Sequence, residues 1–181
     1  MAANNLYLIG YRATGKTTVA QRLGRQLDRP VVDADDLIEA RAGMPIKDIF
    51  AEAGEDGFRD VETEVINDLS QRGETVVALG GGAVLRKQNR QLLQDTGPMV
   101  WLQASADTIL ERIQGDPTTT DRRPNLTHAG GLQEIQELLS ARELVYQKCA
   151  DHCVDTEGKS PGSVADAIYR WVIQYWQDRN G

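Results

Sequence analysis

The sequence predicts an α/β protein in which a parallel sheet is covered by helices on both faces, giving three α/β/α layers. Short apolar segments alternate along the chain with longer segments of helical periodicity, a pattern typical of parallel sheets. The first apolar segment leads into a glycine-containing loop at residues 10–17 and then into a helix. No repeat, low-complexity segment or linker interrupts the 181 residues, so we expect one domain over residues 1–181.

Five apolar segments have the length of buried strands and are bounded by polar residues, glycine or proline. These expected strands span residues 6–9, 30–33, 75–79, 99–102 and 152–154. The segments between them carry apolar residues every three or four positions, as on one face of a helix. The expected helices span residues 18–27, 37–42, 45–53, 55–71, 86–94, 106–113, 132–150 and 161–178. Gly43 and Gly54 end two of them, because glycine disfavours the helix interior.

Composition and charge limit the classes of partner. The chain is 40% hydrophobic and 26% charged, and its net charge of −7 argues against a nucleic-acid or anionic-membrane surface. Residues 1–5 are too short for a signal peptide, and no apolar run approaches transmembrane length. We therefore expect a cytoplasmic protein, as a monomer, without a nucleic-acid or membrane partner.

The cysteines and histidines show no metal-binding pattern. Cys149 and Cys153 lie four residues apart, which is neither C-x-x-C nor a zinc spacing, so we expect buried or half-buried free thiols. His128 and His152 have no companion ligand at metal spacing. We expect both histidines to be structural or surface residues.

Residues 10–17 have the G-x-x-x-x-G-K-T spacing of a phosphate-binding loop, between a strand and a helix as this motif requires. Backbone N–H groups of such a loop and the positive end of the helix converge on a polyphosphate. Lys16 can reach the outer phosphates, and the Thr17 hydroxyl can ligate the accompanying Mg²⁺. The complete pattern disfavours a glycine turn without a ligand. The expected nucleotide-binding residues here are Gly10, Arg12, Ala13, Thr14, Gly15, Lys16, Thr17 and Thr18.

Acidic residues follow the second expected strand, at the edge of a parallel sheet where ligands gather. Asp33 and Asp35 are expected to point the same way from an extended segment, because side chains repeat every second residue. One carboxylate can hold the magnesium shell, and the other can face a hydroxyl that accepts a phosphoryl group. The alternative is an acidic strand end that caps the next helix, and Asp36 suits that role best.

The third strand ends in three glycines, at residues 80–82, where bare backbone lets a small ligand approach closely; a flexible turn is the alternative. Residues 115–131 lack periodicity and are long for a loop, so we expect a functional lid. Arg123 lies on this lid and Arg142 on the helix after it, and both are expected to converge with Arg59.

Taken together, these motifs resemble the shikimate kinase family in order and spacing. They are Gly10 to Thr17, Asp33-x-Asp35, Phe58-Arg59 with Glu62, Gly80-Gly81-Gly82, Arg123-Pro124 and Arg142-x-x-x-Tyr146. The resemblance covers the chain from Leu6 to about Val164. It implies a P-loop kinase fold like that of nucleoside-monophosphate kinases, with a five-stranded parallel sheet in the order 2-3-1-4-5. It also implies ATP-dependent phosphorylation of the shikimate 3-hydroxyl, in aromatic amino acid biosynthesis.

The resemblance assigns roles by position. Asp35 would bind the shikimate hydroxyls, and Arg59 and Arg142 would grip the carboxylate. Thr17 would ligate Mg²⁺ directly, and Asp33 would hold it through water. Further shikimate contacts would come from Gly80, Gly81, Gly82, Phe50, Phe58 and Glu62. Further ATP contacts would come from Arg112, Arg123 and Pro161. Catalytic roles would fall to Lys16, Asp35 and Arg123.

Two departures from the family pattern concern the loop and the lid. Ala13 stands where the family usually has glycine, and Asn125 replaces a common apolar residue; we expect the loop geometry to survive. Two alternatives stay open. Another small-molecule kinase, such as a gluconate kinase, shares the phosphate loop but should not need the predicted acceptor residues. A nucleotide-binding module without turnover should have lost at least one catalytic side chain.

Overall fold

In the computed structural model, which describes residues 4–115 and 131–180, five strands form one parallel sheet in the order β2-β3-β1-β4-β5. The strands are β1 Leu6–Ile9, β2 Val31–Asp33, β3 Val76–Ala78, β4 Met99–Gln103 and β5 His152–Asp155. Leu8 of the central strand β1 pairs with Ala78 on one side and with Val100 on the other. The predicted parallel sheet and its 2-3-1-4-5 order are confirmed.

Helices connect the strands and cover the sheet. They are α1 Lys16–Leu27, α2 Ala34–Ala42, α3 Ile46–Gln71, α4 Lys87–Thr96, α5 Ala106–Gly115, α7 Gly131–Cys149 and α8 Pro161–Asn180. Within α3, Gly54 has φ 69° and ψ −171°, so the predicted break between two helices appears as a kink. Within the described ranges, none of the helices combines the length and apolar character needed to cross a bilayer.

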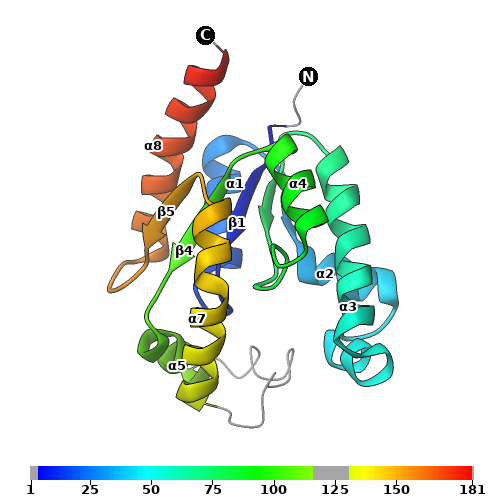
Figure 1. The fold of residues 1–181 in the computed structure, drawn as a ribbon. Helices are drawn as coiled ribbons and strands as arrows, with labels where there is room; N and C mark the ends of the chain where they lie inside the picture. The colour runs from blue at the N-terminus through cyan, green and yellow to red at the C-terminus, as the bar shows by residue number, and fades with distance from the viewer. Residues whose placement is uncertain (1–3, 116–130, 181) are drawn as a thin grey trace.

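Helices cover both faces of the sheet (Figure 1), and the side chains of β1 alternate between two buried cores. Leu6 and Leu8 belong to a core that includes residues of α1 and α8. Tyr7 and Ile9 belong to a second core on the other face, with residues of α2, α3, α4 and α7. All four side chains are buried. Because burial of apolar surface drives folding, this two-sided core accounts for the three-layer arrangement.

Two helices begin earlier than the apolar periodicity predicts, because their first turns are polar. α1 starts at Lys16, directly after Gly15. α2 starts at Ala34, where the extended residue Asp33 caps the helix by accepting the N–H of Asp35 at 3.0 Å. The prediction that Asp36 suits the capping role best is therefore wrong, since the cap must precede the helix.

Both cysteines are free thiols, as predicted, but they differ in exposure. Cys149 is buried, whereas Cys153 is exposed on β5, which the sequence did not predict. Burial raises the pKa of each thiol above its ordinary value.

At neutral pH we expect a disulfide reagent such as DTNB to titrate one thiol in the native protein, the exposed Cys153, and two in denaturant. Cys153→Ser should abolish the native reaction and Cys149→Ser should retain it; the reverse result would contradict this assignment.

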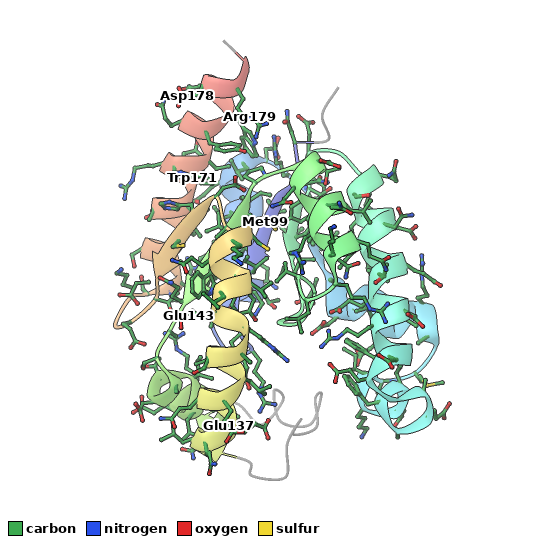
Figure 2. The ribbon with its side chains drawn as sticks, in the orientation of Figure 1. Met99, Glu137, Glu143, Trp171, Asp178 and Arg179 are labelled. Atoms are coloured by element: carbon green, nitrogen blue, oxygen red, sulfur yellow. The ribbon has the colours of Figure 1, made fainter. Side chains whose placement is uncertain are left out.

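The aromatic side chains of α8 are half-buried, as predicted for Trp171 and Tyr175. Trp171, labelled on α8 in Figure 2, stacks on His152 with ring centroids 4.7 Å apart. Tyr175 lies 5.1 Å from Trp171. Burial lowers the pKa of His152, which fits its predicted structural role. His128 lies outside the described residues.

Candidate active site

The loop between β1 and α1 is held by hydrogen bonds among its own residues. Lys16 Nζ donates to the backbone oxygens of Gly10 at 2.9 Å and Tyr11 at 2.7 Å. The Thr14 hydroxyl donates to the Tyr11 oxygen at 2.8 Å. Gly10 has φ 136°, and a Cβ atom there would lie 2.5 Å from the Leu102 oxygen. The loop therefore requires glycine at this position, and it presents the N-terminus of α1 as an anion site.

Ala13 replaces the family's usual glycine and adopts the backbone conformation that glycine favours. Its φ is 60°, in the left-handed region. A non-glycine residue in this region costs roughly 1–2 kcal/mol. Its backbone oxygen also accepts a hydrogen bond from Arg112 Nη1 at 3.3 Å. The loop therefore keeps a glycine-like conformation at this position in spite of the substitution.

The two predicted magnesium-binding side chains meet where the first turn of α1 lies beside the end of β2. The Thr17 hydroxyl donates to Asp33 Oδ2 at 2.6 Å. Burial raises the pKa of Asp33, against the effect of this hydrogen bond. Asp35 lies in the first turn of α2, so the predicted extended Asp33-x-Asp35 segment is wrong. The carboxylate and hydroxyl oxygens that meet here are ligands of the type that Mg²⁺ prefers.

Two arginines from different helices reach consecutive residues of the triple glycine. A Cβ atom at Gly82 would lie 2.2 Å from Nη2 of Arg59, and one at Gly81 would lie 3.6 Å from Nη1 of Arg142. Both arginine residues are buried. The structure thus brings Arg59 and Arg142 together, as predicted. At Gly82, however, a guanidinium group occupies the space that the sequence assigned to an approaching ligand.

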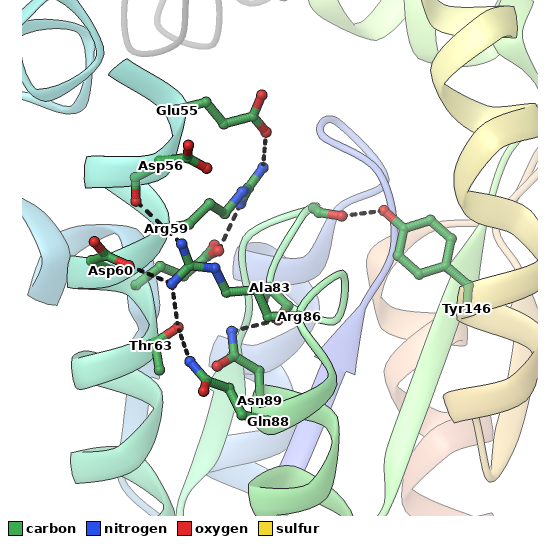
Figure 3. A network of polar contacts seen from close by, with 12 residues as sticks. Glu55, Asp56, Arg59, Asp60, Thr63, Ala83, Arg86, Gln88, Asn89 and Tyr146 are labelled. Carbon is green, nitrogen blue, oxygen red and sulfur yellow. Dashed lines mark hydrogen bonds and ion pairs between the residues drawn. The ribbon is translucent and has the colours of Figure 1, made fainter. Parts of the chain in front are cut away.

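Arg59 is fixed by acidic residues on its own helix. Its Nη1 pairs with Glu62 Oε2 at 2.6 Å and its Nη2 with Glu55 Oε1 at 3.2 Å (Figure 3). Burial is the largest single effect and lowers the pKa of Arg59, but the ion pairs with Glu62 and Glu55 together outweigh burial, so the pKa is raised. The i,i+3 spacing of Arg59 and Glu62 places both side chains on the same face of α3, which accounts for their contact. By contrast, no ion pair joins Arg142 to a carboxylate among the residues that the structure describes.

The backbone that follows β3 is held from α3, α4 and α7 (Figure 3). The Tyr146 hydroxyl donates to the Gly81 oxygen. Asn89 Nδ2 donates to the Ala83 oxygen at 2.9 Å, and Arg86 bonds to side chains of α3. The i,i+4 spacing from Arg142 is the signal that places Tyr146 on the same helix face. Sequence reasoning missed the roles of Asn89 and Arg86, which no motif marks.

The two phenylalanines predicted to line the acceptor site lie together on α3. The rings of Phe50 and Phe58 stack with centroids 4.6 Å apart. Phe58 is fully buried and Phe50 is half-buried. Arg59 Cζ lies 5.1 Å from the Phe58 ring. The structure therefore places these aromatic side chains beside one of the two arginines at the triple glycine.

Arg112, one of the predicted ATP contacts, joins the phosphate loop to the segment that follows β5. Arg112 donates to the hydroxyl and the backbone oxygen of Thr156, each at 3.1 Å. Pro161 is exposed at the start of α8, and Thr18 is exposed in the first turn of α1. Arg123 and residues 116–130 lie outside the described residues, so the predicted lid arginine stays a prediction.

Sequence reasoning also missed a buried carboxylate beside the loop. Arg12 Nη2 pairs with Glu134 Oε1 of α7 at 3.5 Å, and the Glu134 side chain is only 1% exposed. The two residues are separated by 122 positions in the sequence, which explains why no local pattern indicated the contact.

Comparisons with known proteins agree with this geometry. The family model described as shikimate kinase matches residues 12–173. A shikimate kinase of Rhodopirellula baltica is 42% identical over 166 residues, which cover 92% of this chain and 89% of the relative. A shikimate kinase from Acinetobacter baumannii, solved in complex with shikimate, superposes with a TM-score of 0.88 and 34% identity, covering 95% of this chain and 94% of that chain.

The gluconate kinase alternative has weaker support. A gluconokinase from Sinorhizobium meliloti superposes with a TM-score of 0.60 at 13% identity, covering 98% of this chain and 96% of that chain. This likeness shows a shared fold alone. The extent and identity of the other matches, together with the paired arginines at the triple glycine, lead to one conclusion: the chain belongs to the shikimate kinase family.

Proposed function

We propose that this protein transfers the γ-phosphoryl group of ATP to the 3-hydroxyl of shikimate, which gives shikimate 3-phosphate and ADP. The observation that carries this assignment is the position of Arg59 and Arg142 at consecutive glycines. The Cβ position of Gly81 is 3.4 Å from the Gly10 oxygen, so the paired arginines adjoin the phosphate loop. A small carboxylic acid held there would face a bound triphosphate.

Phosphoryl transfer depends mainly on the alignment of the two substrates and on the neutralisation of charge on the phosphates. A bond forms between the shikimate oxygen and the γ-phosphorus while the bond to the bridging oxygen of ADP breaks, through a loose transition state. Lys16 and Arg123 neutralise charge on the phosphates. Asp35 aligns the attacking hydroxyl and accepts its proton late in the transfer. Arg59 and Arg142 hold the carboxylate, with Glu62 orienting Arg59.

We also infer that Thr17 and Asp33 hold the Mg²⁺ that accompanies ATP. The Thr17 hydroxyl would ligate the ion directly, and Asp33 would hold it through water. Their 2.6 Å hydrogen bond keeps both oxygens together, between the first turn of α1 and the end of β2. Bound Mg²⁺ supplies positive charge to the β- and γ-phosphates. We propose that the enzyme acts as a monomer in the cytoplasm on these small-molecule substrates.

A coupled assay of ADP release tests the function directly. The protein is supplied with ATP and Mg²⁺, and with shikimate, with gluconate, or with no acceptor. We expect ADP release that depends on shikimate. Turnover with gluconate alone would favour the other kinase class. Nucleotide binding without turnover under all three conditions would favour a non-catalytic module.

Arg142→Lys is expected to raise the shikimate KM roughly tenfold or more, because lysine cannot match two carboxylate oxygens with a planar fork. The ATP KM should change little. Steady-state kinetics with each substrate varied in turn measure both values. Lys148→Arg, the reverse exchange at an exposed position of α7, serves as the control. An unchanged shikimate KM in Arg142→Lys would remove this side chain from the acceptor site.

A further inference from the structure

Tyr11 is buried within the phosphate loop, although the motif leaves its residue type open. Only 2% of the residue is exposed. Its side chain belongs to an apolar cluster with Ile109 of α5 and Ile135 of α7. The ring therefore packs the phosphate loop against the two helices that carry Arg112 and Arg142.

Two guanidinium groups lie at the same distance from the Tyr11 ring. The Cζ atoms of Arg12 and Arg142 are each 5.8 Å from its centroid. Cations within about 6 Å of an aromatic ring are attracted to its face. Burial raises the pKa of Tyr11, so the phenol stays neutral and offers no carboxylate-like charge of its own.

The two arginines differ in their counter-charge. Arg12 pairs with the buried carboxylate of Glu134 at 3.5 Å. Arg142 has no such ion pair among the described residues, and its guanidinium lies at Gly81. Of the two cations beside the ring, Arg142 is therefore the one positioned to receive an anionic ligand.

The backbone of Tyr11 contacts both halves of the proposed site. Its carbonyl oxygen accepts hydrogen bonds from Lys16 Nζ at 2.7 Å and from the Thr14 hydroxyl at 2.8 Å. Its Cα atom lies 3.6 Å from the Cβ position of Gly81. One residue thus supports the lysine of the phosphate loop with its main chain and the arginine at the triple glycine with its ring.

We propose that Tyr11 is a positioning residue for Arg142, and thereby determines how strongly the enzyme prefers an acceptor with a free carboxylate. This inference rests on the proposed function, because it takes Arg142 to bind the shikimate carboxylate. The ring face holds the guanidinium at the triple glycine before substrate binds. With an aliphatic side chain in place of Tyr11, the Arg142 guanidinium would stay mobile until substrate binds. Its loss of rotational freedom would then occur on binding and weaken the interaction with the shikimate carboxylate.

The test compares Tyr11→Leu with Tyr11→Phe, using shikimate and its methyl ester as acceptors. For Tyr11→Leu we expect the shikimate KM to rise about tenfold, while the ATP KM stays close to that of the wild type. The preference for shikimate over the ester should shrink by the same factor, because the ester lacks the charge that Arg142 recognises. Tyr11→Phe keeps the ring and should recover the wild-type KM and preference.

Trp171→Leu, which removes a half-buried ring from α8, serves as a control. It should leave the shikimate KM and the preference for shikimate over its methyl ester unchanged. A Tyr11→Leu enzyme that loses activity equally with both acceptors, or with an unchanged shikimate KM, would overturn the proposal. If this variant does not fold, Tyr11→Met, which replaces the ring with a flexible unbranched side chain that adapts to the apolar cluster, carries the same expectation. A wild-type protein inactive on shikimate would instead refute the proposed function.

Discussion

Replacing Lys16 with methionine is expected to lower kcat/KM by about 10³-fold, because the variant loses the cation that neutralises the outer phosphates in the transition state. In the structure, the backbone oxygens of Gly10 and Tyr11 hold the ammonium group at 2.9 and 2.7 Å. Methionine keeps most of the side-chain length but cannot donate these hydrogen bonds. Initial rates at saturating and subsaturating ATP separate the effect on kcat from that on KM.

Lys148→Met provides the matched control, since Lys148 is exposed on α7 and its substitution removes the same charge. Thermal unfolding followed by circular dichroism shows whether either variant is less stable. We expect the control to keep wild-type kinetics. Wild-type kcat in a folded Lys16→Met variant would contradict the role assigned to this lysine.

Asp35→Asn is expected to lower kcat by about 10²- to 10³-fold, with little change in stability. The amide keeps the shape of the side chain but cannot take the hydroxyl proton. The N-terminal cap of α2 should survive, because the Asp33 carboxylate accepts a hydrogen bond from the backbone N–H of Asp35. The Asp35 side chain takes no part in this hydrogen bond. Single-turnover measurements with bound ATP and shikimate would report the transfer step itself.

Asp36→Asn is the control for this second prediction. Asp36 is exposed and shares the first turn of α2, so both substitutions remove a favourable charge from the N-terminus of the same helix. Only Asp35→Asn should slow phosphoryl transfer. Equal rate losses in the two variants would show that the turn needs negative charge in general, and not a carboxylate at Asp35.

Local patterns predicted most of the fold because each depends on neighbouring residues. The glycine spacing of the phosphate loop and the alternation of apolar segments and helices both lie within short stretches. The failures occurred where a local rule was extended too far. Side-chain alternation was applied from Asp33 to Asp35, although the helix begins at Ala34 and the backbone is no longer extended there. Because α2 begins at Ala34, its N-terminal cap is Asp33 and not Asp36.

The sequence by itself determined the phosphate loop, the parallel α/β architecture and the identity of the paired arginines. Only the tertiary structure decided that Arg59 fills the space at Gly82 and that Tyr11 lies beside Arg142. The physical reason is distance along the chain. Contacts of this kind join segments brought together by burial on the sheet, and the choice among many possible partners depends on packing that no short pattern records.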